Sequence, residues 1–279
     1  MNLNVNRMEI EAAVKRAGGF VAMPHRKVGN LAKYVNIVRE LAVADFRLKY
    51  HDSALGYVWS MLNPLLMFGV YFFVFTRVFK STIQDYPIFL LIGIFNYAFF
   101  QDCTFSAMNS LSGKSGLMKK IYFPRAIIVF ASSSTCIFSY FLNTLVLLCL
   151  VFFMRGLPPL ALLVPIPIAC LILFSMGVAF LLATLYAYFR DMSQIWAVLV
   201  LMIFWVTPIV FDVDSLPPTV SNLVYFNPLT RIFGLLRHYL LYNYFDLRFL
   251  LMTILYSVLS LVVGFAVFQR HEKRLPELF

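Results

Sequence analysis

Residues 126–154 read AIIVFASSSTCIFSYFLNTLVLLCLVFFM and hold no charged side chain. A helix that crosses the hydrocarbon core of a bilayer needs about 20 mostly apolar residues, so this stretch predicts a membrane-spanning helix. Further runs of the same kind, before and after it, predict an all-α polytopic membrane protein. The six predicted spans are residues 57–76, 86–109, 126–154, 162–187, 192–211 and 249–269.

The composition of the whole chain agrees with a membrane protein. Of the 279 residues, 61% are hydrophobic, 17% aromatic and only 13% charged, whereas soluble domains carry about 25% charged residues. So little polar surface excludes a cytosolic enzyme, a secreted disulfide scaffold and a disordered chain. No disulfide or zinc site is expected, because the four cysteines lie in apolar runs without a CxxC pair.

The distribution of positive charge predicts how the chain is oriented. Lys and Arg concentrate on the cytoplasmic side of membrane proteins. With a cytoplasmic N-terminus, 17 of the 23 basic residues flank the spans on that side, so both termini are expected in the cytoplasm. The net charge of +10 belongs to these flanks and forms no basic stripe with exposed aromatics, so no nucleic-acid partner is expected.

Two segments neither span the membrane nor resemble simple loops. In residues 31–50, apolar and basic residues fall mostly on different helical faces, which predicts an amphipathic helix at the cytoplasmic interface. A short helix packed on the bundle is the alternative. In residues 212–246, three prolines separate pieces too short to span. They predict extracellular re-entrant helices that act as a gate, with a surface-lying loop as the alternative.

The sequence contains no motif for catalysis or nucleotide hydrolysis. Gly113-Lys114-Ser115 imitates the end of a phosphate-binding loop, but Met108 stands where the first glycine is needed. Asp102 is the only candidate for an intramembrane charge, whereas ion-coupled carriers need several as a relay. Energy for transport is therefore expected from a cytoplasmic partner. The basic and apolar loop 111–125 could dock that partner, or could simply connect two spans along the membrane.

Five short strings follow one another in a defined order. The first is FRLKY at 46–50 with SALGYVWSMLNPL at 53–65. The others are LMKKIYFPR at 117–125, YFRD at 188–191, TPIV at 207–210 and NPLT at 227–230. Together with the six-span layout, these strings resemble the ABC-2 family of permeases, which are the membrane subunits of polysaccharide and polyol-phosphate exporters.

This resemblance implies a homodimer in the cytoplasmic (inner) membrane, bound to two copies of a cytoplasmic ABC ATPase subunit. ATP and Mg would bind to that partner, and no cofactor, metal or catalytic residue is expected on this chain. The implied organisation is a cytoplasmic tail (1–30), an ABC-2 type transmembrane domain (31–269) and a second cytoplasmic tail (270–279). The loop after the second span would be the coupling helix, and the outer short helices the gate.

The candidate site residues fall into four groups. The ATPase-coupling loop comprises Leu117, Lys119, Lys120, Tyr122, Phe123 and Arg125. The candidate glycan channel comprises Tyr57, Trp59, Tyr71, Phe72 and Phe75, because aromatic rings suit the C–H faces of sugars. The candidate outer gate comprises Tyr225, Phe226, Asn227 and Pro228, and the cytoplasmic turn comprises Arg190 and Asp191. Most aromatic side chains in such a protein face lipid or pack between helices.

The expected function is export of a lipid-linked polysaccharide, with O-antigen as the first candidate. Teichoic acid, capsule or another cargo is the alternative within the same family. An ion-coupled carrier is less favoured because intramembrane charge is nearly absent. A membrane-embedded transferase would need catalytic groups at a membrane face, where only the scattered Asp191, Asp212 and Asp214 stand.

Overall fold

The computed structural model describes residues 30–50, 58–78, 83, 85–120 and 123–275, and within these ranges it contains helices and no strand. The predicted tail 1–30 lies almost wholly outside them, as do Tyr57 and Tyr122. In chain order the helices are α2 Asn30–Tyr50, α3 Val58–Phe73, η1 Val74–Val78, α4 Tyr86–Gly113, α5 Ser115–Lys120, α6 Ala126–Arg155, η2 Pro159–Leu163, α7 Pro165–Tyr188, α8 Met192–Val206, η3 Val213–Ser215, α9 Pro218–Val224, α10 Pro228–Arg237, η4 His238–Tyr242 and α11 Leu247–His271.

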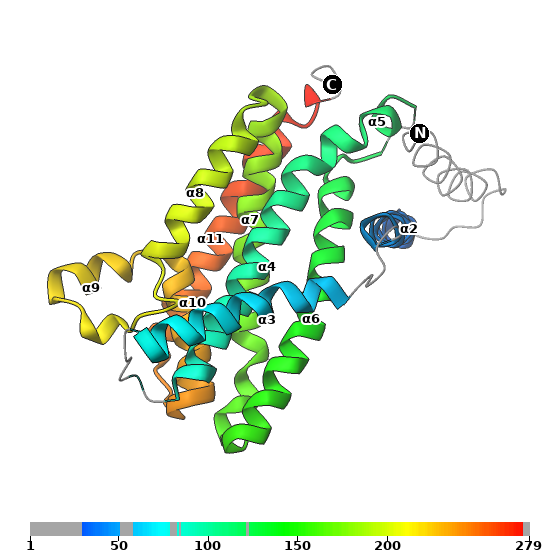
Figure 1. The fold of residues 1–279 in the computed structure, drawn as a ribbon. Coiled ribbons are helices and arrows are strands. Elements are labelled where there is room, and N and C mark those ends of the chain that lie inside the picture. Colours follow the sequence, from blue (N-terminus) through cyan, green and yellow to red (C-terminus); the bar gives the residue numbers. More distant parts are fainter. Residues whose placement is uncertain (1–29, 51–57, 79–82, 84, 121–122, 276–279) are drawn as a thin grey trace.

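Four long helices, α4, α6, α7 and α11, form the centre of the bundle (Figure 1). Helix α4 packs against both α6 and α7, and it is buried on nearly all sides, with Ile88, Phe95 and Met108 among its fully enclosed side chains. Helix α3 crosses the face of α4, and α2 is seen end-on beside α6 (Figure 1). The bundle therefore has a densely packed centre with α2, α3 and α8 on its outside.

Helices α7 and α11 approach so closely that their backbones touch at two glycines. A Cβ atom on Gly264 would lie 2.0 Å from the carbonyl oxygen of Gly177, and one on Gly177 would lie 2.3 Å from the backbone of Ser260. Small residues at such crossings let membrane helices pack by backbone contact. This contact makes α7 and α11 the most tightly joined pair in the bundle.

Within the described ranges, five helical segments are long and apolar enough to cross a membrane, which confirms the predicted all-α polytopic class. They are Met61–Val78, Tyr86–Gly113, Ala126–Arg155, Pro159–Tyr188 and Leu247–His271. The helix in the remaining predicted span, 192–211, is shorter than expected: α8 has 15 residues and ends at Val206. Pro208 has no backbone N–H to continue a helix and disfavours helical geometry at Thr207. The count of six spans stays a prediction.

In the predicted outer segment 212–246, the two short α-helices α9 and α10 have different surroundings. Helix α10 packs against α4, α7 and α11, and its Ile232, Phe233 and Leu236 are fully buried. Helix α9 stands away from the bundle (Figure 1), and its Leu223 is 70% exposed. At 7 and 10 residues, neither helix can span a bilayer.

The amphipathic segment predicted at 31–50 is helix α2. Leu41 is buried in an apolar cluster with residues of α4 and α6, and Phe46 meets Phe138 of α6 edge-to-face at 5.7 Å. Val35 and Val43 are exposed. One side of α2 therefore packs on the bundle, while other apolar side chains remain available to a membrane interface.

Candidate functional site

The candidate coupling loop lies at the end of the bundle that also holds the C-terminal end of α11 (Figure 1). The backbone N–H of Arg125 donates to Glu272 Oε1 at 2.6 Å, which ties the loop to the residues after α11. Phe123 and Met118 are buried in the apolar cluster that includes Leu41 of α2. These contacts hold the loop on the bundle. Helix α5 carries Leu117, Lys119 and Lys120, but their side chains and Tyr122 lie outside the described part of the structure.

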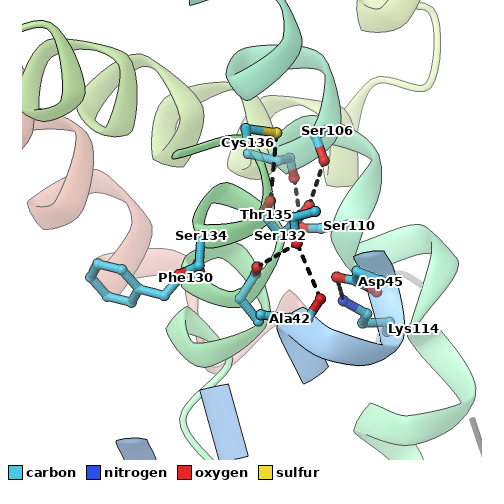
Figure 2. Close-up of polar contacts among 12 residues, drawn as sticks. Ala42, Asp45, Ser106, Ser110, Lys114, Phe130, Ser132, Ser134, Thr135 and Cys136 are labelled. Carbon is cyan, nitrogen blue, oxygen red and sulfur yellow. Dashed lines mark hydrogen bonds and ion pairs between the residues drawn. The ribbon is translucent and has the colours of Figure 1, made fainter. Parts of the chain in front are cut away.

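A group of polar contacts joins α2, α4 and α6 next to this loop (Figure 2). Lys114, directly after α4, pairs with Asp45 of α2, and both are largely buried, with side chains 9% and 21% exposed. Thr135 Oγ1 of α6 donates to the carbonyl of Ala42 at 3.3 Å, and the hydroxyls of Ser106 and Ser132 lie 2.7 Å apart. We call these contacts the polar joint. It connects the start of α5 to the amphipathic helix.

Breaking the ion pair of the polar joint should destabilise the protein measurably. In Asp45→Asn the Lys114 ammonium stays largely buried without its counter-charge, so we expect a loss of about 2 kcal/mol of unfolding free energy. The double variant Asp45→Asn/Lys114→Gln should recover part of that loss, because two amides can still hydrogen-bond. Unfolding by SDS titration of the purified chain measures both.

The control for this pair is Arg155→Gln. Arg155 pairs with Asp85 at 2.8 Å at the other end of α4 and α6, but that pair is about one-third exposed. An exposed ion pair contributes about 0–1 kcal/mol, so Arg155→Gln should change stability little. Equal losses for Asp45→Asn and Arg155→Gln would contradict the special role of the buried pair.

A short non-helical segment follows α8 and is held by one arginine. Arg237 of α10 is 4% exposed. Its Nη1 donates to the carbonyl of Pro208 at 2.7 Å, and its Nη2 lies 3.3 Å from the carbonyls of Ile209 and Phe89. Its guanidinium carbon also lies 3.4 Å from the centre of the Phe89 ring. Irregular backbone within a membrane bundle needs such internal partners, because lipid offers no hydrogen bonds.

Two other contacts complete the support of this segment. The Tyr86 hydroxyl of α4 donates to the carbonyl of Val210 at 3.1 Å. A Cβ atom on Gly93 would come within 2.9 Å of the Ile209 side chain, so the glycine lets the segment lie directly on α4. The segment is thus fixed between α4 and α10.

The structure brings together two sequence strings that the chain separates, TPIV and NPLT. Asn227 Nδ2 donates to Thr207 Oγ1 at 2.8 Å. The Asn227 side-chain oxygen accepts from the N–H of Leu229 at 3.0 Å and so caps α10, with Pro228 in the first turn. Asn227 therefore joins the start of α10 to the end of α8.

The remaining candidate gate residues differ in exposure. Phe226 is 70% exposed. The carbonyl of Tyr225 accepts from Arg231 Nε at 2.8 Å, and its ring meets Phe249 of α11 edge-to-face. Of the candidate gate, Asn227 and Tyr225 are anchored to the bundle, and Phe226 projects outward.

The candidate channel aromatics do not share one environment. Trp59 is 47% exposed. Tyr71 stacks on Phe204 of α8 at 5.5 Å, and Phe72 stacks on Phe68 of its own helix. Phe75 packs against Tyr86 at 6.4 Å. The described candidates therefore contact different neighbours rather than forming one aromatic surface. Trp59 lines a cleft.

That cleft, of about 390 Å³, lies between α3, α4 and α6. Aromatic rings on its walls come from Trp59, Phe99 and Phe105. Its polar residues are Asn63, Gln101, Asp102, Ser139, Tyr140 and Asn143. Its walls thus combine aromatic and polar side chains near the middle of two long apolar helices. The other candidate pair, Arg190 and Asp191, is exposed in the turn between α7 and α8.

These features define a multi-pass, all-α membrane protein in which a non-helical segment follows α8 and the short helix α10 packs into the bundle. The chain belongs to the ABC-2 type transporter family, whose model matches residues 38–241. It is therefore a transport permease subunit of the inner membrane, and the match confirms the family inferred from the five strings.

Three relatives match between 68% and 89% of the chain. The O-antigen export system permease protein RfbA of Klebsiella pneumoniae is 27% identical over 252 residues, which is 89% of this chain and 97% of that protein. RfbA of Myxococcus xanthus is 24% identical over 68% of this chain and 74% of its own length. The polysialic acid transport protein KpsM of Escherichia coli is 23% identical over 85% of this chain and 93% of its own length.

Sequence motifs do not single out Arg237 or Asn143. The position of Arg237 inside the mostly apolar run of residues 232–241 is nevertheless a signal of burial. Asn143 lies in a long apolar run with no motif around it. Its position beside a cleft could be seen only once α4 and α6 were placed together.

Proposed function

We propose that this chain is the permease subunit of an ATP-driven exporter that moves a lipid-linked polysaccharide, with O-antigen as the first candidate, across the cytoplasmic membrane. The observation that carries the proposal is the match along 97% of a relative named as an O-antigen export permease. The likeness to KpsM, named for polysialic acid transport, makes capsule export the second candidate.

The proposal includes two copies of this chain and two cytoplasmic ATPase subunits that bind ATP and Mg. Exposed apolar side chains on α3 and α8, such as Val70 and Leu201, would face lipid or the second copy. A single copy contains a cleft of about 390 Å³, which does not form a channel through the bundle. The glycan would therefore pass between the two copies. Trp59 and the other candidate aromatics would contact it, and the segment around Tyr225–Pro228 would gate the outer side.

Helix α5 is the proposed contact with the ATPase. It lies between the polar joint and the residues bound to the end of α11. A push on α5 would therefore reach both α2 and α11. The proposal places α5, both termini and the turn at Arg190 and Asp191 in the cytoplasm. This orientation agrees with the distribution of basic residues.

The test is deletion of the gene followed by complementation. We expect the deletion to strand intact polysaccharide on its lipid inside the cell, and the wild-type chain to restore surface polysaccharide. The variant Lys119→Ala/Lys120→Ala/Tyr122→Ala should reach the membrane but lose export and ATPase co-purification at least about tenfold, because an apolar and basic helix docks in a partner groove. Immunoblots of the surface glycan and affinity purification measure these outcomes.

The control is Lys273→Ala, which removes an exposed basic residue just after α11. It should export normally. Normal surface polysaccharide in the deletion strain would contradict the proposed cargo. Normal co-purification and export by the triple variant would contradict docking through α5.

A further inference from the structure

The cleft between α3, α4 and α6 combines groups that are costly to leave facing lipid. Asp102 lies on α4 (Tyr86–Gly113), and Asn143 lies on α6 (Ala126–Arg155), each well away from the helix ends. Polar side chains at such depth face protein, water or a ligand rather than hydrocarbon. The cleft of about 390 Å³ is within the usual size of small-molecule sites, about 300–1,000 Å³.

One wall of the cleft carries a hydrogen-bond acceptor that the described residues leave unsatisfied. Asn143 is 7% exposed, and its side-chain oxygen is buried without a hydrogen-bond partner among them. The neighbouring Tyr140 donates its hydroxyl to Asn96 instead. A buried acceptor without a donor costs about 1–3 kcal/mol. The site is therefore incomplete until a donor enters it or a neighbouring side chain rearranges.

The chemistry of the walls selects a class of ligand. Trp59 is 47% exposed at the cleft and offers a flat ring to a ligand. Asn63 and Gln101 are exposed polar side chains that can both donate and accept hydrogen bonds. None of the described residues that line the cleft is Lys, Arg or His, so a phosphate would find no counter-charge. A neutral molecule with many hydroxyls and apolar C–H faces fits best.

We propose that this cleft binds a sugar unit, with Trp59 against one face of the ring and Asn143 and Asp102 accepting hydrogen bonds from hydroxyls. The assignment of this sugar to the transported cargo rests on the proposed function. The cleft would then hold the glycan by individual units as it moves, and it would make the α3–α4–α6 side of each copy part of the transport path.

The direct test is a fluorescence titration of the full-length chain in lipid nanodiscs. The probes are the methyl glycosides of glucose, galactose, mannose, rhamnose and N-acetylglucosamine. We expect a saturable change in tryptophan fluorescence with at least one glycoside, and its loss in Trp59→Phe. Asn143→Ala and Asp102→Asn should each raise the Kd about tenfold, because each weakens a hydrogen bond at a largely enclosed position.

Two further variants make the titration decisive. Asn63→Ala alters an exposed side chain of the cleft, so it should weaken binding without affecting the fold. Asn109→Ala is the matched control, since Asn109 is an exposed asparagine of α4 that does not line the cleft. Its side chain donates to the carbonyl of Phe105, one turn earlier in the same helix. It should bind within about twofold of wild type. No response to any glycoside, or wild-type binding by Asn63→Ala, Asp102→Asn and Asn143→Ala alike, overturns the inference.

Export assays separate this inference from the proposed function. If deletion strands polysaccharide inside the cell but Asn143→Ala and Asn63→Ala export normally, the cleft inference fails and the export function stands. If deletion leaves surface polysaccharide unchanged while glycosides still bind through Trp59, the export function fails and the sugar site stands. Loss of both glycoside binding and export in the cleft variants supports the two together.

Discussion

Arg237→Ala should lower the unfolding free energy by about 3 kcal/mol or more and reduce export at least about tenfold. The substitution removes the donors directed at the carbonyls of Pro208, Ile209 and Phe89. Each buried acceptor left unsatisfied costs about 1–3 kcal/mol. Removing the desolvated charge offsets part of this loss. SDS-titration unfolding and the surface-glycan immunoblot measure the two effects.

The conservative variant Arg237→Lys distinguishes charge from geometry. A lysine ammonium keeps the charge but lacks the planar fork that reaches several carbonyls at once, so its stability should lie between Arg237→Ala and wild type. Arg248→Ala is the matched control, because Arg248 is exposed at the start of α11, and it should change stability by less than about 0.5 kcal/mol. Wild-type stability in Arg237→Ala would contradict the role assigned to this residue.

Gly264→Leu should prevent the chain from folding in the membrane, and Gly264→Ala should cost about 3 kcal/mol. The first added carbon would lie 2.0 Å from the carbonyl oxygen of Gly177. The obstacle is backbone rather than a flexible side chain, so α7 and α11 must separate. Overpacking of a core costs about 1–3 kcal/mol, and occasionally more. Membrane yield and SDS-titration unfolding measure the loss.

Gly69→Ala is the control for this prediction. Gly69 lies in α3, and an added Cβ there would meet nothing within 4 Å. Alanine favours a helix over glycine by about 1 kcal/mol, so stability should stay the same or rise slightly. Similar losses for Gly69→Ala and Gly264→Ala would show that the close crossing is not what makes Gly264 sensitive.

The sequence predicted helices best where charge and apolar runs mark their ends. The span expected at 126–154 is found as Ala126–Arg155, because Arg155 ends the uncharged run. The span expected at 192–211 extends beyond the end of the helix. The apolar run continues through Val210, but Pro208 stops the helix at Val206. Hydropathy indicates that a segment lies in the membrane, but it does not indicate where the helical hydrogen bonds of that segment end.

The candidate site was less predictable because its contacts depend on the placement of whole helices. The strings TPIV and NPLT were visible in the sequence, but the bond between Thr207 and Asn227 requires α8 and α10 to meet. Likewise, Asp45 and Lys114 lie 69 positions apart in the chain. Periodicity can assign a residue to a helical face, but it cannot say which distant residue that face meets.

The glycine contact between α7 and α11 divides the molecule into a stiff and a compliant portion. The backbone contact at Gly177 and Gly264 resists sliding at that point, and Phe180 of α7 packs against Phe265 and Phe268 of α11, so these two helices form a rigid pair. By contrast, α8 has only Trp196 and Val200 buried, and no residue of α3 except Pro64 is buried among its described side chains. In the proposed dimer, a push on α5 would therefore displace α3 and α8 before α7 and α11, and the space between the two copies would widen as α3 and α8 move.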